Sequence, residues 1–550
     1  MTESIKTSVL IAGAGPVGLV LAMELAAQGV SALIIEPRER LEPPNVKCNH
    51  VSARSMEIFR RLGVAAIVRD AGLPENYPHD IAYRTTTTGQ ELTRIPIPCR
   101  RDRYMATQGP DTGWPTAEPP HRINQIYLEP ILFKHAEAQP EIQILNRKAL
   151  SDFTQDEYGV HALATGIDDG STLQIDCDYL IGCDGGKSIV RKKIGAKLNG
   201  DAIVQRVQSS YIRTPHLLKQ LQHPPAWATF SLNPRRSGNV YAIDGRELWL
   251  IHNYLREDEP GFESVDRDQS IRAILGVGAD FDYEIISKED WYGRRLVADY
   301  FRDHRVFICG DAAHLWVPYA GYGMNAGIAD ASNLAWLLSA RLQKWGAPGI
   351  LAAYEAERLP ITEQVSHFAM NHAHAMAQQR KGVPADIEKP GIEGEQLRVR
   401  LGQQAYELNV QQYCCAGLNF GYFYDKSPLI VYDDETAPAY SMGGFTASTV
   451  PGCRAPYFDL DKDTPLYDRL GKGYTLLRFD ASCEVAPLVQ ATQFHHMPLT
   501  LLDASGNDSI PAAYRHKMLL LRPDQHIAWR GDALPADISN LMNVLRGATA

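Results

Sequence analysis

The opening of the chain contains a strand, a glycine-rich turn, a helix and a second strand in immediate succession. Thr7 to Ala12 (TSVLIA) is a short apolar run typical of a buried parallel strand, and Gly13-Ala14-Gly15-Pro16-Val17-Gly18 follows it. Glycines at such a turn allow the backbone to approach a pyrophosphate, which the N–H groups and the positive dipole end of the next helix stabilise. Glu36 ends the second strand 18 residues after Gly18, where an acid that holds a ribose hydroxyl is expected. The N-terminus is therefore predicted to be a Rossmann-like unit that binds a dinucleotide.

Two later motifs place acidic residues directly after apolar, strand-like runs. Asp184-Gly185 follows the run at 173–182, and Gly310-Asp311-Ala312-Ala313-His314 follows the run at 306–309. Ligands of open α/β sheets bind at the carboxyl ends of the strands, so both acids are predicted to reach the cofactor held by the first turn. Asp-Gly and Gly-Asp are also common turn pairs, and turn formation is the alternative role of either acid taken alone. The three segments together indicate FAD.

Composition narrows the class of protein. The 550 residues suffice for three or four domains, and the net charge of -10 gives nucleic acid or an anionic membrane no basic surface to bind. Glycines, Pro16 and Glu24 interrupt the first apolar stretch, which argues against a signal peptide or a membrane span there. The nine cysteines are scattered without a CxxC pair, as expected for reduced thiols in the cytoplasm.

Two other chemistries lack their motifs. His367, His372 and His374 are spaced by five and two residues, whereas helical metal ligands at i and i+4 share one face. No GxSxG elbow nominates a serine nucleophile. We therefore expect no metal site and no hydrolase of that type.

Three motifs in the right order carry a resemblance to a known family. They are GAGPVG at 13–18, CDGGKSIVR at 183–191 and GDAAHLWVPYAGYGMNAGIADA at 310–331. With them the chain resembles the class A FAD-dependent aromatic hydroxylases, and among these the branch of phenol hydroxylase and 2-hydroxybiphenyl 3-monooxygenase. STVPGCRAP at 448–456 and LLLRPDQHIAWRG at 519–531 resemble the thioredoxin-like C-terminal domain of that branch, here without a CxxC pair and hence structural.

The resemblance implies an α/β fold with three parts. A Rossmann-like FAD-binding domain of the glutathione reductase type would comprise residues 1–75, 116–190 and 295–380, and a mixed β-sheet substrate domain residues 76–115 and 191–294. A linker at 381–397 would precede a thioredoxin-like domain at 398–550. Strand-like runs such as ATFSL and LWLIHNYL between 200 and 300 and a helix from Met324 to Leu342 agree with this division.

The implied activity is hydroxylation of a phenolic ring with O2, through a flavin C4a-hydroperoxide and ortho to an existing hydroxyl. Only one strand-GxGxxG-helix unit is present, so NADPH or NADH is expected to bind transiently as electron donor. The family also implies a homodimer with no nucleic-acid or membrane partner. Alternatives are a tailoring monooxygenase of a polycyclic or polyketide aromatic, by hydroxylation or Baeyer-Villiger insertion, a flavin dehydrogenase without oxygen transfer, and a non-catalytic flavin-binding protein.

The resemblance also assigns roles along the cofactor. Glu36 and Arg38 would contact the adenosine half, Gln125 the flavin chain, and Asp311 after Gly310 the ribityl hydroxyls. Asp184 would serve both FAD and NAD(P)H, and Lys47 stands where relatives have an arginine. Pro318 would lie beside the flavin edge where oxygen reacts, and the backbone of Gly323-Met324-Asn325 would face the pyrimidine ring. A helix N-terminus at that place would stabilise the anion of the reduced flavin.

The residue that handles the phenol proton is left open by the sequence. Asn49 occupies the position where phenol hydroxylase has an acid and the biphenyl enzyme a histidine, and an amide can hold a phenol but cannot act as a base. His50 can act as a base, although in an extended segment it points away from Asn49. Tyr211, Trp249 and His252 are candidate substrate contacts, with His121 and Arg122 as further candidates for the pocket wall. Sheet core is the alternative role of each aromatic residue.

Overall fold

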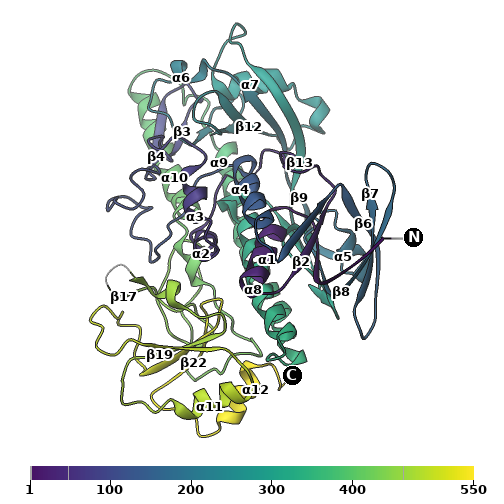
Figure 1. The fold of residues 1–550 in the computed structure, drawn as a ribbon. Helices are drawn as coiled ribbons and strands as arrows, with labels where there is room; N and C mark the ends of the chain where they lie inside the picture. The colour runs from purple at the N-terminus through teal and green to yellow at the C-terminus, as the bar shows by residue number, and fades with distance from the viewer. Residues whose placement is uncertain (1–2, 48, 462–463, 550) are drawn as a thin grey trace.

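The computed structural model describes residues 3–47, 49–461 and 464–549. Two eight-stranded sheets and a four-stranded sheet form its framework. Figure 1 shows the sheet that contains β1 at the right, the sheet that contains β12 at the top and the C-terminal unit at the bottom.

The first sheet is the Rossmann-like part of the fold. Five of its strands are parallel, and their carboxyl ends carry Gly13, Asp184 and Gly310 to one edge, as the sequence predicts. Its strand order is β14 (Arg302–Asp303), β15 (Val306–Ile308), β8 (Thr172–Gly182), β1 (Glu3–Ala12), β2 (Ala32–Glu36) and β5 (Ile142–Asn146). The antiparallel strands β6 (Lys148–Gln155) and β7 (Val160–Gly166) extend it from β8.

Helices cover this sheet and connect it to the rest of the molecule. Those concerned are α1 (Pro16–Ala27), α4 (Gln125–Glu137), α5 (Ile189–Ile194) and α8 (Tyr322–Leu342). Gly327 is needed where α8 meets α1, because a Cβ there would lie 2.6 Å from the Val17 side chain and 2.9 Å from Gly310 Cα. The sequence places this helix correctly, two residues short of its observed start at Tyr322.

The second sheet is mixed and draws on four separate stretches of chain. Its order is β16 (His314–Trp316), β13 (Glu284–Ala298), β9 (Leu198–Arg213), β12 (Leu248–Tyr254), β11 (Gly238–Ala242), β10 (Ala228–Ser231), β3 (Ile81–Arg84) and β4 (Glu91–Ile95). Helix α7 (Arg267–Leu275) covers one face, and α6 (Leu217–Gln220) follows β9. β16 directly follows the Gly310–His314 motif, so the cofactor motif and this sheet are continuous in the chain.

Two long helices lead from the sheets toward the C-terminus. They are α9 (Ala352–Lys381) and α10 (Ile392–Tyr413), so residues 392–397 of the expected linker are helical. Leu401, Ala405 and Tyr413 of α10 belong to the same core as Trp227 and Phe230 of the second sheet. Residues 398–413 therefore pack on the substrate sheet, away from the thioredoxin-like sheet to which the sequence assigned them.

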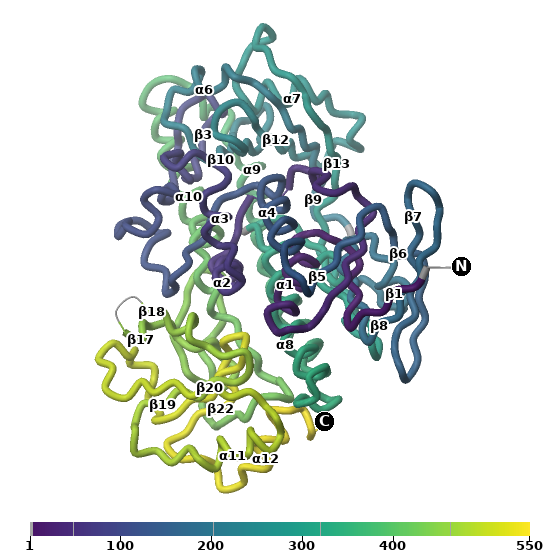
Figure 2. The backbone as a smooth tube through the Cα atoms, viewed as in Figure 1, coloured from purple at the N-terminus to yellow at the C-terminus, as the bar shows by residue number. Residues whose placement is uncertain are grey.

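The C-terminal unit is a small mixed sheet with a parallel β19–β20 pair and antiparallel β21 and β22. Its elements are β17 (Asp459–Asp461), β18 (Thr464–Pro465), β19 (Tyr474–Arg478), α11 (Ala486–Phe494), β20 (Leu499–Asp503), β21 (Met518–Leu521), β22 (Ile527–Gly531) and α12 (Ile538–Leu545). The trace in Figure 2 shows the C-terminus beside the end of α8, and Ala347 N donates to Arg546 O at 2.8 Å. None of the helices in the described ranges is long and apolar enough to cross a bilayer.

Two short helices complete the fold near the cofactor motifs. α2 (Ala53–Arg61) starts at an Ser52 N-cap, whose side chain accepts from Ser55 N, and α3 (Ala65–Asp70) follows it. α2 lies against both α8 and the C-terminal unit, because Arg54 and Glu57 bond to Gln525 and Arg454 respectively. The C-terminal unit therefore holds α2, the helix that directly follows the segment with Asn49 and His50.

Candidate functional site

The glycine-rich turn has the shape of a pyrophosphate cradle. Gly13 has φ +107°, and a Cβ there would overlap the carbonyl oxygen of Cys183. A Cβ at Gly18 would overlap the carbonyl oxygen of Gly13. Gly15 is different, because it is the N-cap of α1 and nothing lies within 4 Å of the place its Cβ would take. The protein leaves open the volume that a phosphate would fill at the helix N-terminus.

The adenosine end is organised by two buried carboxylates. Glu36 accepts from Ala14 N at 2.6 Å and from Arg38 Nε at 2.9 Å. Glu129 accepts from Arg38 at 2.6 Å and from Gln125 at 2.9 Å, and burial raises the pKa of Glu129. A small recess is lined by Glu36, Arg38 and Glu129 together with Asn146. Glu36, Arg38 and Gln125 are therefore one connected group, and Glu129, which the sequence did not single out, is its centre.

Asp184 both caps a helix and keeps one oxygen free. Its Oδ2 accepts from Ile189 N at 2.7 Å and from Val190 N at 3.2 Å, so the turn-forming role is real. Its Oδ1 is buried and has no hydrogen-bond partner in the described part of the chain. An unpaired buried acceptor beside the cradle fits a hydroxyl donor from the cofactor.

The Gly310–His314 loop is held by an acid that sequence reasoning missed. Asp330 on α8 is fully buried, and its carboxylate accepts from Gly310 N at 3.2 Å and from Arg358 at 2.8 Å, and pairs with His314 at 2.8 Å. Burial works against the charge, yet Arg358 and His314 hold the pKa of Asp330 below its ordinary value. In the sequence, Asp330 could have been recognised as a single acid within the apolar pattern of helix α8.

Asp311 projects from this loop into accessible space. Its side chain is exposed to solvent. Desolvation by the surrounding protein raises the pKa of the carboxyl, and the charges of His314 and Lys47 offset part of that rise. Because no hydrogen bond ties Asp311 to another described side chain, its carboxylate is available to a polyhydroxyl ligand.

We expect Asp311→Ala to weaken FAD binding by about ten-fold or more, since a hydrogen bond to a charged group contributes roughly 1.5–3 kcal/mol. The melting temperature of the cofactor-free protein should not change, because Asp311 supports no other residue. Equilibrium dialysis against FAD measures the first quantity and circular dichroism the second. Global unfolding of the variant would instead assign Asp311 to turn formation.

The N-terminus of α8 is the predicted flavin end of the site. Gly321 is its N-cap with φ +61°, and Pro318 starts the short helix Tyr319–Gly321 just before it. The side chain of Asn325 is buried and engaged, because it accepts from Ser52 N at 2.8 Å and Ser55 Oγ at 2.7 Å and donates to His50 O at 3.1 Å. Only the backbone of Gly323-Met324-Asn325 is thus left to face a ligand at the helix N-terminus.

One face of the second sheet forms an aromatic wall next to this point. Tyr211, Tyr241 and His252 share that face, and the His252 ring lies 5.4 Å from Tyr241 and 5.7 Å from Trp291. The His252 side chain is half-buried on this face, and burial lowers its pKa to about 4. Tyr319, the neighbour of Pro318, donates to Gln205 of β9 at 3.1 Å, which joins the wall to the flavin end.

Trp249 does not belong to this wall. It is three residues from His252 on one strand, so alternation turns it to the opposite face, where its neighbours are Ile212 and Ala242. Helix α7 packs over that face, with Ile274 against Gly238. The geometry gives Trp249 a place in the sheet core and no place in a substrate pocket.

Asn49, His50 and Lys47 have three different environments. Asn49 is half-buried, and its amide oxygen accepts from Asn124, the N-cap of α4. His50 is buried against Gly321 and bonds through Nδ1 to Arg122. Burial first, then Arg122, Arg103 and His121, hold the pKa of His50 well below its ordinary value. This arrangement argues against His50 as a general base. Lys47 is exposed, 3.9 Å from Glu289 of β13.

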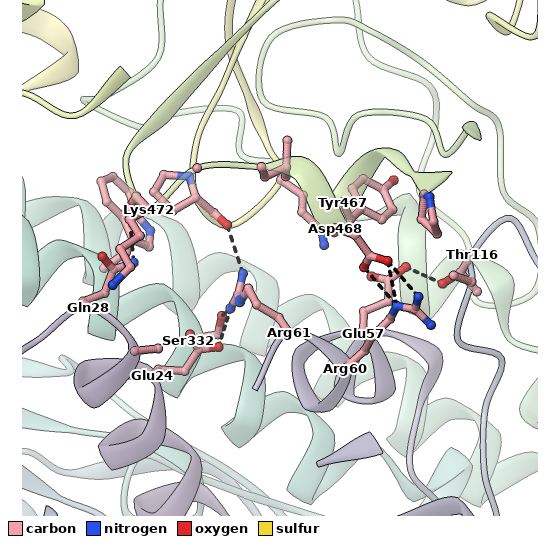
Figure 3. A pocket seen from close by; sticks show the side chains of 18 residues that line it. Glu24, Gln28, Glu57, Arg60, Arg61, Thr116, Ser332, Tyr467, Asp468 and Lys472 are labelled. Carbon is pink, nitrogen blue, oxygen red and sulfur yellow. Dashed lines mark hydrogen bonds and ion pairs between the residues drawn. The ribbon is translucent and has the colours of Figure 1, made fainter. Parts of the chain in front are cut away.

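A separate cavity of about 210 Å³ lies between α1, α2 and the C-terminal unit (Figure 3). Two ion pairs lie in its wall, Arg60 with Asp468 at 2.7 Å and Arg61 with Glu24. It contains none of the residues predicted for FAD, and we interpret it as a polar contact between domains.

Comparisons with known proteins match both the N-terminal and the C-terminal parts of the chain. The family model described as FAD binding domain matches residues 6–369, and the one described as aromatic-ring hydroxylase, C-terminal matches residues 448–548. A putative polyketide hydroxylase of Streptomyces halstedii is 28% identical over 97% of this chain and 95% of its own length. Phenol 2-monooxygenase of a Pseudomonas strain is 28% identical over 99% of this chain and 93% of its own. The predicted phenol hydroxylase branch is thus one of several kinds of relative.

Solved structures give the same result. The rebeccamycin biosynthetic enzyme RebC with reduced flavin has 32% identity and a TM-score of 0.89, and the match covers 100% of each chain. The fold, the glycine-rich turn and the similarity over the full chain therefore all indicate the same family. The chain belongs to the family of FAD-binding aromatic-ring hydroxylases.

Proposed function

We propose that this protein is an NAD(P)H- and O2-dependent monooxygenase that hydroxylates a phenolic aromatic substrate, ortho to an existing hydroxyl. The observation that carries the proposal is the aromatic wall of Tyr211, Tyr241 and His252, which Tyr319 joins to the α8 N-terminus beside Pro318. A planar ring held there would lie between apolar surfaces and next to the reactive end of the cofactor. A cytoplasmic homodimer is the working state that the resemblance implies.

FAD, once reduced by NAD(P)H, supplies the activation of O2. The balance is one ring C–H, one O2, one NAD(P)H and one proton consumed, with one ring C–OH, one water and one NAD(P)+ formed. The chain contributes the positions of the reactants. The wall keeps water from the ring, and Asn49, fixed by Asn124, offers its amide N–H to the substrate hydroxyl.

The chain also tunes the charge of the site. The backbone N–H groups at the start of α8 stabilise negative charge on the cofactor, and Gly310 and Asp311 position its sugar-alcohol chain. The hydrogen bonds of Asp330 to Gly310, His314 and Arg358 restrict the movement of the Gly310–His314 loop. Catalysis of this kind depends on the distances between the reactants, so buried residues that fix the cofactor loop, such as Asp330, contribute to it.

A tailoring monooxygenase of a fused-ring natural product is the second candidate. It is favoured by full-length similarity to the rebeccamycin biosynthetic enzyme and to the polyketide hydroxylase. The two candidates share fold, cofactor and electron donor, and differ in the size of the ring system that they accept.

A substrate screen separates them. We expect NAD(P)H oxidation by the FAD-loaded protein to rise several-fold with the correct phenol or polycyclic phenol, because the family withholds reduction until a ring is bound. Product identification by mass spectrometry gives the position of the new hydroxyl. Equal oxidation rates with every aromatic and no oxygenated product would support a dehydrogenase.

A further inference from the structure

Arg122 is a buried arginine without an anionic partner. It is 3% exposed, and within the described residues its one hydrogen bond goes to Nδ1 of His50, while its Nη2 has no partner. Every other buried arginine of the described chain donates to at least one carboxylate or carbonyl oxygen. A guanidinium taken out of water without an anion is costly, so the exception calls for a ligand.

The nearest carboxylate is already committed elsewhere. Asp111 accepts from Arg103 at 2.6 Å and from Trp114 Nε1 at 2.9 Å. Asp111 is thus bonded to Arg103, and it is only a nearby charge for Arg122. The neighbouring imidazoles are neutral and leave the charge of Arg122 unchanged, since burial and these arginines lower the pKa of His50 and His79, and burial and Arg69 lower that of His121. The cluster keeps about one uncompensated positive charge.

The guanidinium is held between the flavin end and the aromatic wall. It stacks over Trp227 with its carbon 4.7 Å from the ring centroid, and over Tyr413 of α10 at 5.9 Å. Trp227 in turn contacts Tyr241 of the wall, with centroids 5.5 Å apart. On the other side its partner His50 lies against Gly321, the N-cap of α8. Stacking fixes the plane of the guanidinium and leaves its edge for a bidentate partner.

We propose that Arg122 is the receptor for an oxyanion carried by the aromatic substrate, a ring carboxylate or a phenolate. This rests on the proposed function and names its substrate class. The bound oxyanion neutralises the buried charge of the cluster, which makes the anionic form of the ligand the preferred one. Arg122 holds the charged group of the ring and so fixes the orientation of the ring.

The same contact assigns a role to His50. Arginine only donates hydrogen bonds, so Nδ1 of His50 accepts and the ring proton resides on Nε2. His50 then acts as a neutral donor that supports the oxyanion. A phenol bound here ionises because the site stabilises its anion, and no protein base has to remove the proton.

Binding of matched acids and amides tests the proposal with the FAD-loaded protein. The probes are 2-hydroxybenzoate against 2-hydroxybenzamide, and 3-hydroxy-2-naphthoate against its amide, titrated through the change in flavin absorbance. We expect the acid of at least one pair to bind about ten- to a hundred-fold more tightly than the amide, as for hydrogen bonds to a charged group. A ratio near one in both pairs, together with no lowering of the pKa of bound 4-nitrophenol, overturns the proposal, and these wild-type results are decisive even if an Arg122 variant fails to fold.

Variants locate the site. Arg122→Gln should bring the acid-to-amide ratio close to one, and Arg122→Lys should retain part of it. Arg267→Gln is the matched control, because Arg267 bonds to Asp290 and Ser209 from the opposite side of the same sheet. Its ratio should equal that of the wild type. A preference that persists in Arg122→Gln places the anion elsewhere.

A second probe distinguishes the two oxyanions. 4-Nitrophenol reports its ionisation by absorbance, and its apparent pKa when bound to the wild type should fall below that of the free phenol if phenolates are taken. An unlowered value beside a large acid preference assigns the site to carboxylates. These are binding measurements, so they are independent of turnover. A protein that hydroxylates but shows neither the acid preference nor the lowered pKa lacks only the anion site. One that shows either signal but gives no oxygenated product loses only the monooxygenase assignment.

Discussion

Gly15→Val should yield a folded protein that does not retain FAD. Gly15 has φ -72° and ψ 176°, values that any L-residue adopts, and the space around its missing Cβ is open. The valine side chain would therefore meet no protein atom and would occupy the place of the pyrophosphate at the N-terminus of α1. The flavin absorbance at 450 nm relative to protein absorbance at 280 nm should fall to near zero, while the far-UV circular dichroism melt stays close to that of the cofactor-free wild type.

Gly13→Ala is the matched control for that experiment. Its φ of +107° and the overlap of a Cβ with the Cys183 carbonyl oxygen put the strain within the protein. We expect this variant to lose stability even without FAD. If Gly15→Val keeps the cofactor at full occupancy, or if both variants lose stability alike, the cradle assignment is wrong.

The second large effect concerns the contact between the C-terminal unit and the rest of the chain. Arg522 is completely buried and donates to Glu357 of α9 at 2.7 Å and to Asp524 at 2.6 Å. Burial raises the pKa of Asp524, but Arg522 beside it holds that pKa below its ordinary value. Arg522→Leu would leave two buried carboxylates facing each other, at a cost of about 3–5 kcal/mol in the free energy of unfolding.

Urea unfolding monitored by tryptophan fluorescence and by FAD release measures this cost. Both signals should move to lower urea together, because Glu357 belongs to the helix that also supports Arg358 and Asp330. Arg515→Leu is the control, since Arg515 is 64% exposed and its pair with Glu435 is worth about 1 kcal/mol or less. A C-terminal unit that unfolds separately, with FAD retained, would contradict this coupling.

Local patterns were sufficient to predict the cofactor half of the fold. The apolar strand before Gly13, the helix through Leu342 and the acid at Glu36 depend on residues near each other in the chain, and each lies where the sequence places it. The sequence could also have excluded Trp249 from the substrate contacts that include His252. The two residues are three positions apart on one strand, so their side chains lie on opposite faces of the sheet.

Contacts between distant segments were not predictable in this way. The bond of His50 to Arg122 depends on the pairing of Val51 with His121, which brings two segments 70 residues apart together. The helical pattern of α10 is visible in its sequence, but its packing on β4 is decided by the shape of the second sheet. The role of Asp330 likewise exists only after Gly310, His314 and Arg358 have converged.

Isotope labelling tests the monooxygenase assignment most directly. Turnover of the substrate found in the screen under 18O2, with NAD(P)H and the FAD-loaded protein, should give a product that contains one 18O atom. The same reaction in H2 18O under unlabelled O2 should give an unlabelled product. A product labelled from water, or consumption of NAD(P)H with no labelled product from any aromatic tested, would contradict the account.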